Sequence, residues 1–214
     1  MRRQGFLSTY TGMIIAANVL FFIGALVLMN SMDELTAISL IALMPATALA
    51  GQNLWTFVTS MFMHAGFGHL LVNMISLMFI GSFVEKLVGK KRFIGLYFIG
   101  GLFAGMLFVL IAFFTGMDLN VYAVGASGAI FALGGLLAVL TPRLPVLVFF
   151  IIPMPMWAAM GVLMFGLWAL SLRLGLPIGN TAHLGGLIVG LGYGFYLKKK
   201  FPRKTKMISK YFAR

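Results

Sequence analysis

The sequence predicts an all-α membrane protein, folded as a bundle of six transmembrane helices with a long outer loop between the first and second helices. Two observations carry this prediction. Of the 214 residues, 61% are hydrophobic and only 9% are charged, and the mean hydropathy is +1.04, a composition that soluble domains of this size do not have. The apolar runs also continue along the whole chain. We therefore expect one membrane domain over residues 1–214 and no separate soluble domain.

The placement of the basic residues supports six crossings. The net charge of +12 could suggest nucleic-acid binding, but with six crossings 15 of the 16 Lys and Arg fall on one side, and only Arg173 falls on the other. They are Arg2, Arg3, Lys86, Lys90, Lys91, Arg92, Arg143 and the eight basic residues of the tail, 198–214. The positive-inside rule then predicts cytoplasmic N- and C-termini, with the tail against anionic headgroups of the lipid bilayer. We expect a multi-pass protein of the plasma membrane that binds no nucleic acid.

The first helix is expected over residues 11–30. The outer segment that follows, residues 31–64, contains acidic but no basic residues. Its apolar part, Leu35–Ala50, is about 16 residues long and contains Pro45, which suits an interfacial or re-entrant piece better than a seventh span. The second and third helices are expected over residues 66–87 and 93–115.

The fourth helix is expected over residues 127–141 and is short. Fifteen residues span about 22 Å, whereas the hydrocarbon core of a bilayer is about 30 Å thick. If Thr141-Pro142-Arg143 marks the cytoplasmic face, Ser127 begins below the outer surface and the loop before it dips into the membrane. Irregular backbone at that depth is tolerated only when it is buried in protein or lines a wet cavity. The length of this helix therefore predicts a buried polar cavity that opens to the outer face.

The last two helices are expected over residues 153–171 and 181–197. The fifth begins in an apolar stretch that contains Pro145, Pro153 and Pro155. Proline removes a helix hydrogen bond, so a bend or a broken start is expected there.

Candidate catalytic groups lie at the predicted outer ends of two helices. Ser127 stands between Gly125-Ala126 and Gly128 at the start of the fourth helix, where unsatisfied N–H groups and the positive end of the helix dipole could hold an oxyanion. His183 begins the sixth helix. A serine beside a histidine forms a nucleophile and general base.

Small residues predict that these two helices pack closely. The sixth helix carries Gly186, Gly190 and Gly194 at four-residue spacing, and the fourth offers Gly128, Ala132 and Gly135. Packing of such ridges brings backbones together and would place Ser127 beside His183. A triad carboxylate is not expected: the only acidic residues are Asp33, Glu34, Glu85 and Asp118, and Glu85 falls at the opposite membrane face.

His69 and Asn73 are four residues apart in the second helix and share one face. Together with the Ser127 backbone N–H they are expected to donate to an oxyanion. His64 and His69 do not converge, because five residues turn a helix by about 140°. We expect no metal site and no cofactor. Taken singly, each feature is also explained by a structural role, as a helix start, a hydrogen-bonded histidine or a packing glycine. Their joint occurrence is harder to explain by structural roles alone.

Four stretches resemble the signature motifs of the rhomboid intramembrane serine proteases: His69-Leu-Leu-Val-Asn73, Gly81-Ser-Phe-Val-Glu85-Lys-Leu-Val-Gly89, Gly125-Ala-Ser127-Gly128 and Ala182-His183-Leu-Gly-Gly186-Leu-Ile-Val-Gly190. The first helix and the long outer loop are similar to the minimal six-helix form of that family. The resemblance implies hydrolysis of peptide bonds in or near the transmembrane helices of substrate proteins. It implies a Ser–His dyad that uses neither metal nor nucleotide.

The resemblance makes Ser127 the nucleophile and His183 the base, with His69 and Asn73 on the oxyanion side. It gives supporting positions to His64, Gly125, Gly128, Phe131, Gly186 and Gly190. Two positions depart from the family pattern. Trp55-Thr56 stands where many members have Trp-Arg, which bears on how the outer loop is anchored. Phe131 stands where some members have Tyr, and it can still stack on His183.

Two other functions compete with a protease. One is a catalytically silent relative that binds and escorts membrane proteins; such relatives typically lack the serine or the histidine, and this chain has both. The other is a small transporter or channel. The chain has no internal repeat and no acidic residue at mid-membrane to favour it.

Overall fold

The structure is a computed structural model and describes residues 5–174 and 179–212. These residues fold as a helical bundle. The expected basic positions Arg2, Arg3 and Arg214 lie outside the described residues. The long helical runs are α1 (Tyr10–Ser31), α5–η2–α6 (Phe67–Ser76, Leu77–Gly81 and Ser82–Val88), α7 (Lys90–Thr115), α8 (Ser127–Leu140), α9–η3–α10 (Met156–Gly161, Val162–Gly166 and Leu167–Leu174) and α11 (Asn180–Lys200). The segments η2 and η3 are π-helical turns inside otherwise continuous helices.

Four helical runs in the described part of the chain are long and apolar enough to cross a membrane: α1, α5–α6, α7 and α9–α10. Two more helices, α8 and α11, lie beside them. The fourth helix is apolar but short, as its sequence predicts, and α11 ends in Lys198-Lys199-Lys200. The protein is therefore a multi-pass helical membrane protein.

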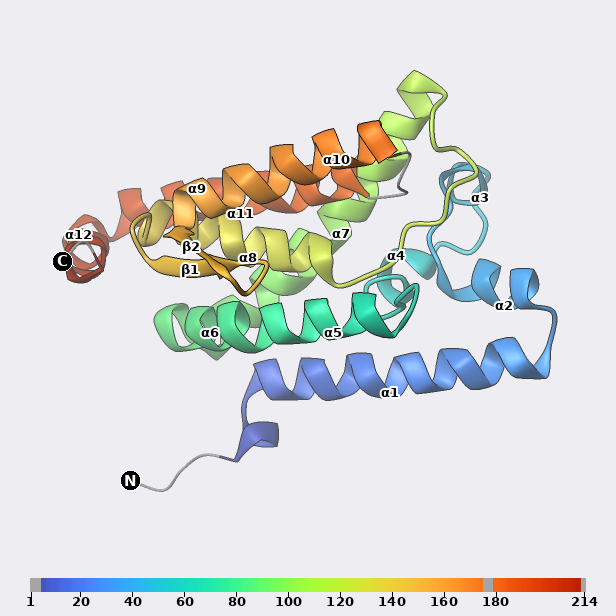
Figure 1. The fold of residues 1–214 in the computed structure, drawn as a ribbon, viewed down its shortest axis with the longest axis horizontal. Coiled ribbons are helices and arrows are strands. Elements are labelled where there is room, and N and C mark those ends of the chain that lie inside the picture. Colours follow the sequence, from blue (N-terminus) through green and yellow to red (C-terminus); the bar gives the residue numbers. More distant parts are fainter. Residues whose placement is uncertain (1–4, 175–178, 213–214) are drawn as a thin grey trace.

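Helix α8 is the centre of the bundle. Every one of its residues is buried except Ser127 and Ala138. Figure 1 shows α8 enclosed by α5, α7, α9 and α11, with α1 on the far side of α5. Figure 1 also shows that α7 extends past the start of α8, so the connection between them runs back along the bundle to reach Ser127. The short α8 thus begins well inside the length of its neighbours.

Helices α8 and α11 are in direct backbone contact. A Cβ on Gly186 would collide with the carbonyl of Gly128, and one on Gly190 would collide with the carbonyl of Ala132. In the opposite direction, a Cβ on Gly135 would come within 2.8 Å of the Leu187 carbonyl oxygen. The predicted packing of the two small-residue ridges is present, because only glycine lets the backbones approach this closely.

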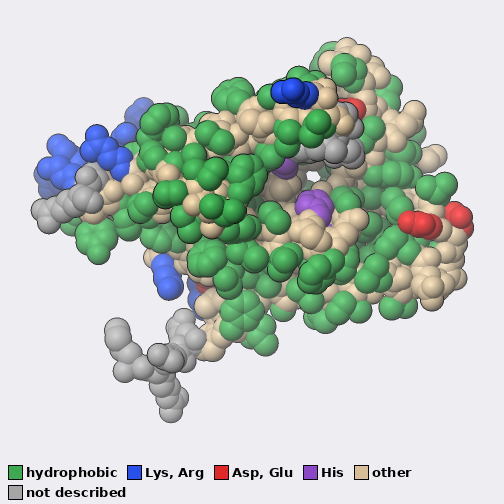
Figure 2. Space-filling view, in the orientation of Figure 1, with side chains coloured by type: hydrophobic (Ala, Val, Ile, Leu, Met, Phe, Trp, Pro, Cys, Tyr) green, Lys and Arg blue, Asp and Glu red, His purple; other side chains and the backbone are tan. Residues whose placement is uncertain are grey.

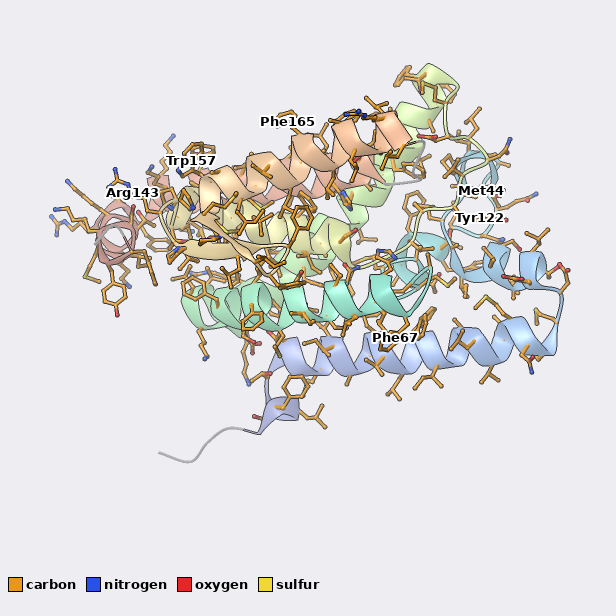
Figure 3. All side chains as sticks on the ribbon, viewed as in Figure 1. Met44, Phe67, Tyr122, Arg143, Trp157 and Phe165 are labelled. Carbon is orange, nitrogen blue, oxygen red and sulfur yellow. The ribbon has the colours of Figure 1, made fainter. Side chains whose placement is uncertain are left out.

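The segment between α1 and α5 folds as three short helices, α2 (Glu34–Ile41), α3 (Pro45–Leu49) and α4 (Thr56–Thr59). None of them is long enough to cross a bilayer, as expected for Leu35–Ala50. Leu43 pairs with Ala123 through two backbone hydrogen bonds of 3.1 and 2.8 Å. Figure 3 shows the neighbours Met44 and Tyr122 side by side, one from each segment. The outer segment therefore holds the loop that leads to Ser127.

The start of the fifth helix differs from the prediction. It begins at Met156 instead of residue 153, and it follows a hairpin of β1 (Pro145–Val148) and β2 (Ile152–Pro155), in which Pro145 pairs with Pro155. A residue before proline is disfavoured from the helical conformation, so Ile152 and Met154, which precede Pro153 and Pro155, are extended in β2. The Met156 N–H donates to the Leu144 carbonyl at 2.9 Å and closes the hairpin onto α9.

The tail after α11 is folded and not extended. It forms α12 (Pro202–Tyr211), which lies across the end of the bundle (Figure 1). The Phe212 ring packs edge-on against Phe83 of α6, with centroids 5.4 Å apart. Figure 2 shows most of the Lys and Arg at this end, a basic group at the upper edge away from it, and acidic side chains at the opposite end. The charges are thus separated along the bundle axis.

Glu85 closes the bundle at the basic end. Its carboxylate accepts hydrogen bonds from the N–H of Tyr10 at 3.0 Å, and from the N–H and hydroxyl of Thr11 at 2.8 Å each. Tyr10 and Thr11 are the first residues of α1, whose opening N–H groups have no partner within the helix. A buried carboxylate thereby satisfies these donors and ties α1 to α6.

Glu85→Ala is expected to lower the free energy of unfolding by at least about 2 kcal/mol, because buried hydrogen bonds to a charged group contribute about 1.5–3 kcal/mol. Thermal or denaturant unfolding in detergent would measure this. The exposed Glu34→Ala serves as the control and should change stability by no more than about 0.5 kcal/mol. Equal effects of the two substitutions would show that the three hydrogen bonds do not stabilise the bundle.

Candidate active site

The structure brings Ser127 and His183 together. Ser127 is the first residue of α8 and His183 lies in the first turn of α11, 56 positions later in the chain. The Ser127 hydroxyl and His183 Nε2 are 2.8 Å apart, a hydrogen-bond distance. The close contact of the two glycine ridges sets this separation, because both groups stand at the same end of their helices.

His183 is held between the helices by stacking. Its ring lies 4.5 Å from the Phe131 ring at an angle of 12°, so the contact expected between these two residues is observed. Nε2 can accept the Ser127 proton only when the imidazole proton is on Nδ1, and the contact itself fits either direction of donation. Among the described residues, Nδ1 has no hydrogen-bond partner. Phe131 has no hydroxyl group, so it orients His183 through ring stacking and not through a hydrogen bond.

Gly125 leaves space for the site. It has φ +118°, a left-handed conformation that favours glycine, and its N–H donates to the Ser60 carbonyl at 2.8 Å. A Cβ there would lie 3.0 Å from His69 Nε2 and 3.7 Å from the Ser127 hydroxyl oxygen. The bare Gly125 backbone therefore allows His69 to approach the nucleophile. Ser60 is a residue that the sequence did not indicate, since it acts through its carbonyl.

His69 presents a proton to this space. Its Nδ1 accepts a hydrogen bond from the Ala65 N–H at 3.4 Å, which assigns the ring proton to Nε2. Because Nε2 faces Gly125 beside Ser127, its N–H is available to a group bound there. Asn73 is buried, and its Nδ2 donates to the His69 carbonyl at 2.9 Å. One of the two Asn73 N–H bonds is thus used within α5, and the other is left to donate elsewhere.

His64 lies behind His69, just before α5. Its Nδ1 is 3.1 Å from the Phe62 carbonyl and its ring stands edge-on to His69, with centroids 5.1 Å apart. Burial, with His69 nearby, lowers the pKa of His64 to about 4, so the ring is neutral at pH 7. A neutral His64 can donate to Phe62 and pack against His69. Within residues 5–174 and 179–212, no three His, Asp or Glu side chains come together as a metal site would require.

The outer segment is anchored without an arginine. The Trp55 indole N–H donates to the Leu40 carbonyl at 2.8 Å, and the buried Thr56 hydroxyl donates to the Asn53 carbonyl at 2.6 Å. Neutral hydrogen bonds to the backbone thus hold Trp55-Thr56, the position where many members of the family that the sequence resembles have Trp-Arg. Histidine side chains are visible through a hollow in this face of the molecule (Figure 2).

Similarity to known proteins extends over about two thirds of the chain or more. The model of the Rhomboid domain matches residues 51–200. RHOMBOID-like protein 5 of Arabidopsis thaliana is 34% identical over 144 residues, which are 67% of this chain and 44% of that protein. Rhomboid protein 1, mitochondrial, of Saccharomyces cerevisiae is 32% identical over 155 residues, 71% of this chain and 44% of that protein. The chain thus spans less than half the length of these relatives.

Proposed function

The chain belongs to the rhomboid family, and from this premise we propose that it is an intramembrane serine endopeptidase. It cleaves peptide bonds in or near the transmembrane segments of membrane proteins by a Ser–His dyad. The observation that carries the proposal is the 2.8 Å contact between the Ser127 hydroxyl and His183 Nε2 at the start of α8 and α11. A nucleophile in hydrogen-bond contact with a base is the arrangement that covalent catalysis needs.

In the proposed reaction, Ser127 Oγ attacks the scissile carbonyl carbon and its proton passes to His183 Nε2. The imidazolium then gives that proton to the leaving amine as the C–N bond breaks, which leaves an acyl ester on Ser127. A water molecule hydrolyses the ester while His183 takes and returns a proton in the same way. Phe131 stacking keeps the ring in line through these steps.

The negative charge on the carbonyl oxygen is met by donors already in place. The Ser127 backbone N–H belongs to the first turn of α8, whose N–H groups have no acceptor within the helix. His69 Nε2–H lies on the other side of Gly125, and the remaining N–H of Asn73 is on the same face of α5. Donors of this kind act when charge develops, and so they favour the transition state over the ground state.

We extend the proposal to placement in the membrane. All six helical runs, including the short α8 and the lysine-ended α11, cross the bilayer as one domain over residues 1–214, and residues 32–66 form the long outer loop. The basic end of the bundle faces the cytoplasm, because Lys and Arg are retained on that side. Both termini then lie in the cytoplasm, and the site opens to the outer face of the plasma membrane, with transmembrane proteins as substrates.

A catalytically silent escort is the competing function, and covalent labelling separates the two. A fluorophosphonate reacts with a serine only when a base activates it, so it should label Ser127 in the folded protein and mass spectrometry should locate the adduct there. Ser127→Ala should remove the label. Absence of labelling in folded protein that still binds a transmembrane substrate would favour the escort.

His69→Ala and Asn73→Ala are each expected to lower kcat by about 10²–10³-fold, with a smaller change in KM, because an oxyanion donor acts mainly in the transition state. Steady-state cleavage of a transmembrane substrate in detergent would measure both constants. Asn73→Asp keeps the size of the side chain and its carbonyl oxygen but removes the donor, and it should be as slow as Asn73→Ala. An effect confined to KM would make either residue a substrate-docking group.

A further inference from the structure

A groove runs along the outside of the bundle between the α9–η3 run and α11, over the C-terminal half of α8. Its volume is about 380 Å³, within the range of ligand pockets in proteins. One wall carries Trp157, Gly161 and Phe165, and the other carries Leu187, Phe195 and Lys198. Figure 3 shows Trp157 and Phe165 along one helical run, with Trp157 nearer to Arg143 and the basic end.

This groove is separate from the candidate active site. Lys198 follows His183 by 15 residues in the same helix, a rise of about 22 Å. Neither Ser127 nor any histidine lines the groove. The groove and the Ser–His pair therefore lie toward opposite ends of α11, and proteolysis does not account for the groove.

The groove has one charged group, and no acidic side chain within residues 5–174 and 179–212 forms an ion pair with it. Lys198 is the only charged residue of the lining. The acidic residue at this end, Glu85, already accepts three hydrogen bonds from Tyr10 and Thr11. The neighbouring Lys200 donates to the Tyr196 hydroxyl at 2.8 Å and packs over two aromatic rings. Lys198 is left exposed at the mouth of an apolar groove, where an anionic group would be complementary to it.

The length of the groove matches one leaflet of a bilayer. Along α11 it extends from Leu187 to Lys198, eleven residues or about 16 Å, and half of a hydrocarbon core is about 15 Å. The exposed Trp157 stands at the same end as Lys198, where Trp is common at the level of lipid headgroups. A transmembrane helix of a second copy would need a groove about twice as long, whereas an acyl chain needs only this one.

We propose that this groove binds one anionic phospholipid, with an acyl chain between α9–η3 and α11 and the phosphate at Lys198. The aliphatic chain contacts the apolar walls, and the headgroup neutralises the lysine at the membrane surface. The site depends on α9–α10 and α11 lying in a membrane. It depends neither on peptidase activity nor on which side of the membrane the basic end faces.

Two variants test the charge. The detergent-solubilised protein is mixed with dioleoyl phosphatidylglycerol or with dioleoyl phosphatidylcholine, and native mass spectrometry counts the lipids retained. Wild-type protein should retain one phosphatidylglycerol in preference to phosphatidylcholine. Lys198→Gln should reduce that preference about fivefold, the attraction of one basic side chain to an anionic headgroup. Lys199→Gln removes the same charge one residue along but outside the groove, and it should leave the preference unchanged.

Two further variants test the groove. Gly161→Leu adds a side chain where a Cβ meets nothing within 4 Å, so it fills the groove without a clash. Ala138→Leu fills it independently from α8. Both should lose the retained phosphatidylglycerol. Gly192→Leu is the matched control, since Gly192 also faces open space but lies outside the groove. Thermal unfolding checks that each variant is folded.

Three results would overturn the proposal. Equal losses in Lys198→Gln and Lys199→Gln would show only a diffuse attraction of lipid to the basic end. Retention of the lipid in both filled variants would place it elsewhere on the surface. A dimer that disappears in the filled variants would make the groove an interface between copies. A protein without peptidase activity that still shows the expected retention would contradict the proposed function and leave this site standing.

Discussion

Ser127→Ala and His183→Ala are each expected to abolish cleavage of a model transmembrane substrate, with kcat/KM reduced by at least about 10³-fold. Ser127 supplies the bond to the acyl group, and His183 moves its proton across the 2.8 Å contact. Removal of either member therefore disables the other. Because residues that act as a unit are not additive, the double variant should be no slower than the worse single variant. Cleavage measured in detergent and in liposomes would give these constants.

The control for this prediction is a serine outside the site. Ser76→Ala, in the last turn of α5, should retain full activity, and all variants should unfold at similar temperatures. A Ser127→Ala preparation of verified sequence with wild-type activity would refute the mechanism. A further loss in the double variant, beyond that of the singles, would mean that Ser127 and His183 act independently.

Gly190→Leu is expected to have the second largest effect, with activity lost by at least about 10²-fold and the bundle destabilised by about 1–3 kcal/mol or more. Even the first carbon of a side chain at Gly190 collides with the Ala132 carbonyl of α8. The collision forces α8 and α11 apart and separates Ser127 from His183. A displacement of about 1 Å between reacting groups costs about 10² in rate, and overpacking costs the stated free energy.

The comparison that isolates this effect is Gly192→Leu in the same helix. A Cβ at Gly192 meets nothing within 4 Å, so the same residue change adds no contact with α8. It should keep activity, and leucine should even favour the helix by about 1 kcal/mol. Fluorophosphonate labelling and thermal unfolding of both variants would separate misplacement of the dyad from unfolding. If both are tolerated alike, close packing of α8 on α11 does not set the Ser–His distance.

The helical runs could be predicted because each is determined locally. Hydropathy alone marks α1, α5–α6 and α7 to within a few residues, since a buried or lipid-facing helix must be apolar along its length. The fifth helix begins at Met156, three residues later than its hydropathy predicts. The apolar residues before Met156 carry the same hydropathy as a helix, and only their pairing with β1 shows that they form a hairpin. The π-turns η2 and η3 have no sequence signal either.

The contact between Ser127 and His183 could be predicted, whereas the hydrogen bonds of the residues around it could not. The spacing of Gly186 and Gly190 indicated which helices meet, and Ser127 with His183 followed from that. Asn73 was expected to face the oxyanion, yet one of its N–H bonds is used by the His69 carbonyl. The support of Gly125 by the Ser60 carbonyl was not expected, because a backbone acceptor leaves no trace in the side chains.

The sequence by itself determined the order of the long apolar helices, their charge asymmetry and the residue types at the candidate site. These properties follow from solvation in a bilayer and from spacing along one helix, which act residue by residue. The tertiary structure alone decided the tautomer of His69, the neutral anchoring of Trp55 and Thr56, and the groove beside Lys198. The groove and the Trp55 bond join different segments, whose distances are set only when the bundle packs. The His69 tautomer and the Thr56 bond depend on backbone atoms within four residues, and a backbone partner leaves no mark in the side-chain pattern.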